Sequence, residues 1–248
     1  MRVLHITDPH LFADLYGELR GTVTADSLQR VLDHYGAGDW RAERVLVTGD
    51  VIQDDTAEAY GRFRDLMLPL NLRMHCVPGN HDVRGLMRDV CVRPPFSYCA
   101  YEEVRDWLLV GIDSCVREDA GGRVSDEEIE RLADIIVRSP AKHVLVFLHH
   151  PPVPMGSKWL DTVGLRNGSE FLERLSTLKR VRAAVFGHVH QEYDREHSGI
   201  RIIATPSTCR QFKPLSDTFA VDDKPPAYRR LVLNDDGSID TETVWVTA

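Results

Sequence analysis

The chain has 248 residues, of which 43% are hydrophobic and 27% are charged, and its formal net charge is −8 at pH 7. This length and apolar content favour one large domain over residues 1–248 rather than two small ones. The acidic balance argues against a nucleic-acid partner, because duplex-binding proteins usually carry a basic stripe. No unbroken apolar run reaches about 18 residues, so we expect no membrane-spanning helix and no membrane partner.

Two features predict a cytoplasmic location. The first residues, Met1–Asp8, have the pattern of a strand and lack the charged, apolar and small-residue regions of a signal peptide. The five cysteines are odd in number and follow no metal-ligand spacing, which favours isolated thiols in a reducing compartment. Neither feature distinguishes a monomer from a homodimer.

Short β-rich runs and amphipathic helical segments alternate along most of the chain. In chain order, the patterns predict a strand at Arg2–Thr7, a helix at Ala25–Tyr35, a strand at Arg44–Thr48, a helix at Thr56–Met67, a strand at Leu72–Val77, a helix at Ser125–Val137, a strand at Val144–Leu148, a helix at Glu170–Lys179 and a strand at Arg182–Phe186. The helix at Ser125–Val137 opens with Ser-Asp-Glu-Glu, which is a capping box. Alternation of this kind indicates a layered α/β fold.

The C-terminal part is predicted to consist mainly of strands, at Ile200–Ala204, Arg229–Leu233 and Thr241–Val246. Strands in direct succession favour a second, more antiparallel sheet that packs on the first. The segment Asp217–Tyr228 is expected to be an ordered surface loop.

Polar residues follow five of the predicted strands: Asp8, His10, Asp50, Asn80, His81, His149, His150, His188 and His190. In open α/β sheets, ligands bind where loops leave the carboxyl ends of strands. Nitrogen and oxygen ligands without thiolates suit metals such as manganese, iron, zinc, cobalt or nickel. About seven ligands are too many for one tetrahedral zinc, so we expect two ions, with Asp50 as the bridging carboxylate.

Five sequence blocks resemble, in order, those of the calcineurin-like metallophosphoesterase family: Asp8-Pro9-His10, Gly49-Asp50, Gly79-Asn80-His81-Asp82, His149-His150 and Gly187-His188-Val189-His190. A single block is a weak signal, but five blocks in order, each at a strand end, are a strong one. The resemblance implies a four-layer α/β/β/α sandwich of two mixed β-sheets flanked by helices.

Further blocks are similar to those of the bacterial class III 3′,5′-cyclic-AMP phosphodiesterases: His149–Pro152, Ser157–Asp161, Leu165–Asn167 and Ala204–Pro214. This resemblance implies a phosphodiesterase whose partner is a small cyclic nucleotide. Such an enzyme hydrolyses cyclic AMP to 5′-AMP through a hydroxide activated by two metal ions. The implied metals are iron and/or manganese, with zinc, cobalt or nickel as alternatives.

The family pattern also implies a role for each matching residue. One metal would be held by Asp8, His10 and His190, and the other by Asn80, His149 and His188, with Asp50 bridging. His81 would stay off the metals and touch the phosphate as the catalytic residue, which either donates a proton to the leaving oxygen or hydrogen-bonds the charge that develops on it. The implied substrate contacts are His10, Asp50, Asn80, His81 and His190.

Some assignments stay open at this level. Successive side chains of a strand point in opposite directions, so only one of His149 and His150 faces the metals, and we prefer His149. Asp82 is expected to orient its neighbours rather than to bind metal. The aromatic residues Trp159, Tyr193 and Phe212 are equally compatible with stacking on a base and with packing.

Two rival functions remain. The first is a phosphodiesterase of the same fold with another substrate, such as a glycerophosphodiester or a 2′,3′-cyclic nucleotide. Purple acid phosphatases are disfavoured, because they place a tyrosine where this chain has Gln53. The second rival is a non-catalytic scaffold, which would usually have lost several ligands that this chain retains.

Overall fold

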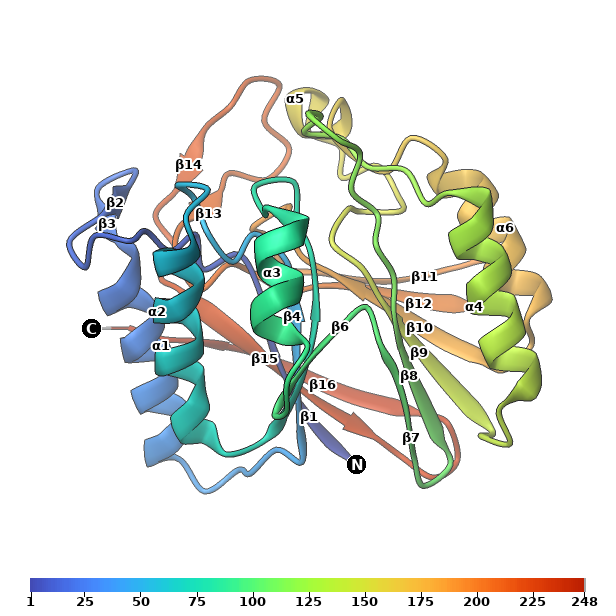
Figure 1. The fold of residues 1–248 in the computed structure, drawn as a ribbon. Coiled ribbons are helices and arrows are strands. Elements are labelled where there is room, and N and C mark those ends of the chain that lie inside the picture. The colour runs from blue at the N-terminus through green and yellow to red at the C-terminus, as the bar shows by residue number, and fades with distance from the viewer. Residues whose placement is uncertain (248) are drawn as a thin grey trace.

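The computed structural model describes residues 1–247, which form two six-stranded mixed sheets packed face to face (Figure 1). The first sheet has the order β16 (Ile239–Trp245), β15 (Ala227–Leu233), β1 (Arg2–Ile6), β4 (Arg44–Thr48), β5 (Arg73–Val77) and β6 (Phe96–Tyr98). The second has the order β11 (Tyr193–His197), β12 (Ile200–Ala204), β10 (Val181–Phe186), β9 (His143–Phe147), β8 (Trp107–Gly111) and β7 (Tyr101–Val104).

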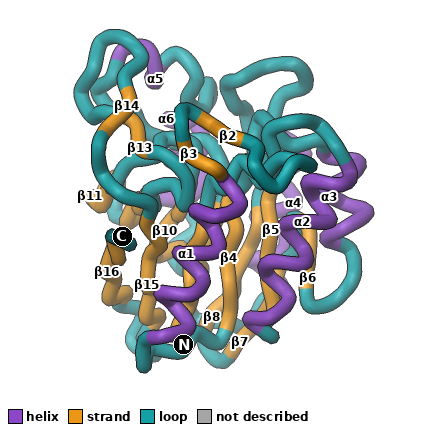
Figure 2. The backbone as a smooth tube through the Cα atoms, turned by 90° about the vertical axis from the view of Figure 1, so that its left-hand side faces the viewer, coloured by secondary structure: helices purple, strands orange, loops and turns teal. Residues whose placement is uncertain are grey.

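Helices cover the outer face of each sheet (Figure 1). The helices over the first sheet are α1 (Thr24–Ala37), α2 (Ala57–Met67) and α3 (Arg84–Cys91), and Figure 2 shows α1 and α2 side by side. The second sheet is covered by α4 (Asp126–Arg138) and α6 (Gly168–Thr177). This arrangement confirms the predicted four-layer sandwich.

The remaining elements are short. They are the 3-10 helix Leu68–Leu70, α5 (Lys158–Asp161), the hairpin of β2 (Glu18–Leu19) and β3 (Thr22–Val23), and the pair formed by β13 (Gln211–Phe212) and β14 (Val221–Asp222). Among residues 1–247, helices long and apolar enough to cross a bilayer are absent.

The central strands are buried on both faces, which explains their continuous apolar sequences. Val3 and Leu46 of the first sheet meet Leu145 of the second in the layer between the sheets. Their neighbours Leu4 and Val45 point the opposite way, into the layer beneath the helices. Strand side chains alternate between faces, so each strand contributes to two apolar layers at once.

The predicted grouping of the C-terminal strands is wrong. β15 pairs with β1 and β16 pairs with β15, so both strands extend the first sheet. β12 instead pairs in parallel with β10 in the second sheet. The second sheet is built mainly from mid-chain strands, and local sequence patterns do not specify which distant strands pair.

A group of charged side chains connects the two sheets. Glu102 on β7 accepts hydrogen bonds from Arg44 at 2.7 Å and from Arg73 at 2.6 Å, both of which belong to the first sheet. Its carboxylate also lies 2.8 Å from Nε2 of His75. Burial alone would raise the pKa of Glu102, but the bonds to His75 and Arg44 hold it well below its usual range. The carboxylate therefore stays ionised and balances the cations of the facing sheet.

We expect Glu102→Gln to lower the free energy of unfolding by about 2 kcal/mol, because it removes the charge and leaves the half-buried Arg44 and the exposed Arg73 without their counter-ion. Urea denaturation at pH 7 measures this change. The exposed neighbour Glu103 provides a matched control, and Glu103→Gln should change stability by less than about 0.5 kcal/mol. Equal effects of the two substitutions would contradict a role for Glu102 in joining the sheets.

Candidate metal centre

The polar residues predicted for the site meet where strands of the two sheets end. β1, β4 and β5 run parallel in the first sheet, and β9 and β10 run parallel in the second. The residues that follow these ends are Asp8 and His10 after β1, Asp50 after β4, Asn80 and His81 after β5, His149 and His150 after β9, and His188 and His190 after β10. Asn80 is half-buried and His81 exposed, whereas the others are buried.

Much of this site has an unusual backbone conformation. Five of the candidate ligands have a positive φ angle: Asp8 at 51°, His10 at 49°, Asp50 at 48°, His188 at 66° and His190 at 49°. Such a conformation costs about 1–3 kcal/mol for a residue other than glycine and persists only where the surroundings enforce it. The sheets therefore hold these side chains in directions that an unstrained loop would not give them.

Two glycines of the sequence blocks allow the loops to approach each other closely. A Cβ atom on Gly79 would lie 2.2 Å from Oδ1 of Asp50, and one on Gly187 would lie 2.6 Å from Oδ2 of Asp8. Any larger residue would collide with a candidate ligand at either position. These contacts give a physical reason for glycine in the Gly-Asn-His and Gly-His blocks.

One group of ligand atoms comes from Asp8, His10 and His190. Oδ1 of Asp8 lies 3.3 Å from Nε2 of His190 and 4.0 Å from Nε2 of His10. The two Nε2 atoms are 3.1 Å apart. All three residues can thus offer one atom each to a common ion.

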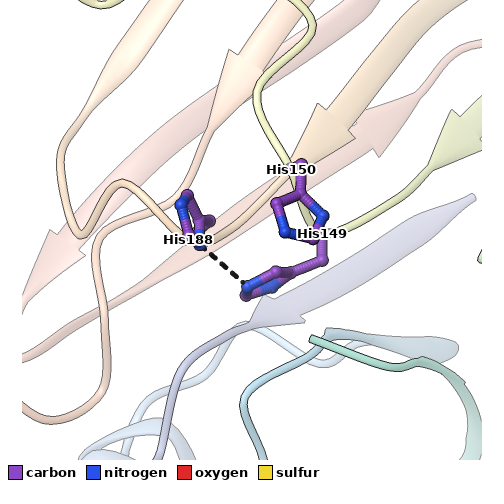
Figure 3. Close-up of side chains that lie close together, drawn as sticks. All are labelled: His149, His150 and His188. Carbon is purple, nitrogen blue, oxygen red and sulfur yellow. Dashed lines mark hydrogen bonds between the residues drawn. The ribbon is translucent and has the colours of Figure 1, made fainter. Parts of the chain in front are cut away.

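A second group surrounds His149. Its Nε2 lies 3.2 Å from Oδ1 of Asn80, 3.1 Å from Nδ1 of His188 and 3.4 Å from Oδ2 of Asp50. Figure 3 shows the rings of His149 and His188 directed toward one another. The same oxygen of Asp50 lies 3.8 Å from Nε2 of His10, so Asp50 stands between the two groups.

The neighbouring histidines His149 and His150 have different surroundings. Nδ1 of His149 donates to the carbonyl of Thr48 at 2.7 Å, which leaves Nε2 facing Asp50. In His150, Nδ1 lies 2.8 Å from the Ser114 hydroxyl and Nε2 lies 3.3 Å from the Ala120 carbonyl. Both nitrogens of His150 are thus engaged by other parts of the chain.

Charge and hydrogen bonding indicate that these residues fit metal ions. Two nitrogens that bind one ion at about 2.0–2.1 Å lie roughly 3 Å apart. The facing nitrogens of His10 and His190, and those of His149 and His188, are each 3.1 Å apart. In His188 the nitrogen that faces this centre is Nδ1, which lies 3.1 Å from Nε2 of His149. Burial would raise the pKa of Asp50, but the His149 ring lowers it well below its usual range. Burial would likewise lower the pKa of His149, yet Asp50 raises it to about 9. The centre therefore attracts positive charge.

Several groups that orient the candidate ligands were missed by the sequence analysis. The Thr7 hydroxyl donates to Asp8 at 2.5 Å, and Nδ1 of His190 donates to the carbonyl of Arg210 at 2.6 Å. Such outer contacts fix the orientation of a ligand and the position of its proton. Backbone carbonyls have no signature in a sequence. Thr7, however, directly precedes the candidate ligand Asp8, so its role could have been predicted from its position.

His81 and Asp82 occupy different positions in the same loop. His81 is exposed, and its ring lies 5.3 Å from that of His10. One of its nitrogens also comes within 4.8 Å of ligand atoms of His10 and Asp50, so geometry alone allows His81 to bind metal. Asp82 accepts hydrogen bonds from the Gly79 amide at 2.8 Å and from the Tyr60 hydroxyl at 2.9 Å, which holds the loop in place.

Comparison with known proteins agrees with this geometry. The family model described as calcineurin-like phosphoesterase matches residues 1–192. The chain belongs to the calcineurin-like phosphoesterase family. Membership confirms the resemblance seen in the sequence blocks, and it implies two divalent metal ions at the centre.

Similar proteins cover almost the whole chain. One from Vibrio vulnificus, named 3′,5′-cyclic adenosine monophosphate phosphodiesterase CpdA, is 39% identical and aligns with 98% of this chain and 89% of its own length. A protein of the same name from Haemophilus influenzae is 37% identical with the same coverage. Among solved structures, a dimetal phosphatase from Danio rerio has the same fold, with a TM-score of 0.67, 16% identity and 99% coverage of both chains.

Metal analysis can test the position of Asp50 between the two groups. Asp50→Ala should lose both ions or leave one loosely held, whereas His10→Ala should mainly weaken the ion beside Asp8. Elemental analysis after dialysis gives the number of ions per chain. The exposed His34 is a control outside the centre, and His34→Ala should keep both ions. One tightly bound ion in both the wild type and Asp50→Ala would rule out a bridging carboxylate.

Proposed function

We propose that the chain is a metal-dependent phosphodiesterase that hydrolyses 3′,5′-cyclic AMP to 5′-AMP. One observation carries this proposal: similarity to enzymes named for that reaction extends over 98% of a chain whose buried histidines and aspartates can offer atoms to common ions. A non-catalytic scaffold would have no need for two buried carboxylates among four histidines.

In this proposal, Asp8, His10 and His190 hold one ion, Asn80, His149 and His188 hold the other, and Asp50 bridges them. An imidazole-rich set of ligands suits iron or manganese and poorly matches the oxygen preference of magnesium. Mn²⁺ should therefore restore activity after chelation more readily than Mg²⁺. All five cysteines are free thiols, which agrees with the cytoplasm as the location of the enzyme.

Bound divalent ions supply positive charge that neutralises the phosphodiester and lowers the pKa of the attacking water. The side chains of the chain orient the substrate and donate hydrogen bonds to it. With Oδ1 of Asn80 directed toward His149, the Asn80 amide N–H group is free to donate to a phosphate oxygen. The proposed contacts to the phosphate also include three residues of the metal centre: His10, Asp50 and His190.

The proton on His81 is positioned by a chain of hydrogen bonds through Gln53. Because His10 offers Nε2 to the centre, its proton is on Nδ1, which donates to Oε1 of Gln53 at 2.9 Å. The Gln53 amide nitrogen then faces Nδ1 of His81 at 3.2 Å and donates to it. Nδ1 of His81 is thereby an acceptor, so the ring carries its proton on Nε2. From Nε2, the neutral ring can donate a hydrogen bond to the charge that develops on the departing ribose O3′.

The effect of His81→Ala should depend on the leaving group. The variant should keep both ions and lose about 10²–10³-fold in kcat on cyclic AMP, as expected when a hydrogen-bond donor to the developing charge is removed. On bis(p-nitrophenyl) phosphate it should lose much less, because p-nitrophenolate leaves without a proton. Equal losses on both substrates with both ions bound would mean that His81 binds phosphate only. Loss of an ion would make His81 a ligand.

Gln53→Leu extends this test to the hydrogen-bonded chain. It removes both bonds of Gln53 and should produce the same dependence on the leaving group, with a smaller loss than His81→Ala. Nitrogen NMR of histidine-labelled protein reports the tautomer directly. The wild type should show His81 protonated at Nε2, and the variant should show a mixture of tautomers.

The substrate itself is tested by comparing kcat/KM for cyclic AMP, cyclic GMP, 2′,3′-cyclic AMP and a glycerophosphodiester. The proposal requires cyclic AMP to be hydrolysed at least as efficiently as the other three, with 5′-AMP as the product. A preference for the glycerophosphodiester or for 2′,3′-cyclic AMP would assign the chain to another phosphodiesterase of the same fold. If none of the four compounds is hydrolysed with Mn²⁺ bound, the chain is a non-catalytic scaffold.

A further inference from the structure

Three aromatic side chains gather beside the candidate metal centre. Trp159 lies on α5, Phe212 on β13, and Phe219 in the loop between β13 and β14. The centroids of each pair of rings are 5.1–5.3 Å apart, and the ring planes are inclined by 69–75°. We call these residues the aromatic cluster. In Figure 1, α5 and the β13–β14 segment lie at the top, on the side where the strands of the site end.

The aromatic cluster directly contacts a candidate ligand. The Phe212 ring stacks on the His190 ring, with centroids 4.0 Å apart and planes inclined by 7°. Nε2 of His190 in turn faces Asp8 at 3.3 Å. The His190 ring thus lies between the aromatic cluster and the metal centre.

The rings of the aromatic cluster differ in their surroundings. Trp159 also packs against the core under α4 and α6, so it anchors the group. Phe219, in contrast, is 43% exposed, and the guanidinium group of Arg20 lies 4.8 Å from its ring centre. Phe219 therefore keeps part of its ring accessible, beside the Phe212 ring that stacks on His190.

The third aromatic residue considered for base stacking, Tyr193, lies elsewhere. It packs near Phe186, with ring centroids 6.5 Å apart, and its hydroxyl lies 2.6 Å from Nε2 of His197. Tyr193 is therefore not a member of the aromatic cluster.

We propose that the aromatic cluster is the subsite for the purine base of the cyclic nucleotide. This inference rests on the proposed function, in which the phosphate lies on the metal centre. The base of a 3′,5′-cyclic nucleotide is separated from its phosphate only by the ribose, so it must lie next to the centre. Aromatic side chains stack on bases with little preference for their identity, because every base has a π face. The subsite therefore recognises a purine without discriminating strongly between adenine and guanine.

The test uses a substrate without a base, methyl riboside 3′,5′-cyclic phosphate, beside cyclic AMP and cyclic GMP. Phe219→Ala should lower kcat/KM for both cyclic nucleotides by about 5-fold to 150-fold, the range found for loss of a stacking ring. The loss should appear mainly in KM, and kcat/KM for the base-free substrate should not change. Phe219→Tyr keeps a ring and should behave like the wild type. Tyr101, an exposed aromatic residue on β7, is the matched control, and Tyr101→Ala should have no effect.

Each result decides a different point. An equal loss on all three substrates would show that Phe219 only supports the loop, and no loss on any would show that it does not meet the base. Either result overturns the subsite and leaves the proposed function intact. A wild type that hydrolyses the base-free phosphate but neither cyclic nucleotide would instead overturn the proposed function.

Discussion

The structure depends on the burial of two carboxylates, Asp8 and Asp50, at the junction of the two sheets. Taking a carboxylate out of water is costly unless positive charge or hydrogen bonds compensate it. In this site the compensation comes from imidazoles of both sheets, and burial of Asp8 is outweighed by the nearby His190, which keeps the pKa of Asp8 below its usual value. Asp8 also accepts the backbone amide of His188 at 3.0 Å, across the boundary between the sheets. The centre is therefore complete only when the sandwich is assembled.

The same constraint explains why so large a scaffold surrounds so few functional atoms. The candidate ligands adopt strained backbone conformations, and strain of about 1–3 kcal/mol per residue needs rigid surroundings to maintain it. The apolar layers on both faces of the central strands supply this rigidity, since a strand packed on two sides cannot shift without opening both. Glycine at positions 79 and 187 then lets the loops close around the carboxylates. The sandwich thus fixes ligand directions that the loops alone would not maintain.

Features that depend on local sequence could be predicted, and those that depend on long-range pairing could not. The helix N-cap at Ser125 is present, with its hydroxyl accepting the Glu128 amide at 3.2 Å, because both partners lie within one helical turn. The other half of the predicted capping box is replaced, since the Glu128 carboxylate accepts from Arg131 at 2.6 Å. Polar residues at strand ends were equally visible. The strand Tyr101–Val104 was not predicted, since its sequence is half charged and its glutamates face solvent or Arg44. The partners of β15 and β16, the Arg210 carbonyl beside His190 and the position of Phe219 all depend on how distant segments meet.

The site combines buried candidate ligands with exposed groups that can meet a substrate. The segment that carries Phe212 connects these two parts. The candidate histidine and aspartate ligands are buried, where low solvent access strengthens their interaction with charge, whereas His81 and Phe219 are exposed and can meet a substrate. The segment that carries Phe212 also supplies the Arg210 carbonyl that accepts the proton of His190. Stacking of Phe212 on His190 adds a second contact between that segment and the same ring. Substitutions that reshape this segment will therefore act on the orientation of a ligand as well as on the surface offered to the substrate. In the proposed assignment, one short segment contributes to both the substrate surface and the metal centre, so substrate preference and metal affinity would be coupled through it.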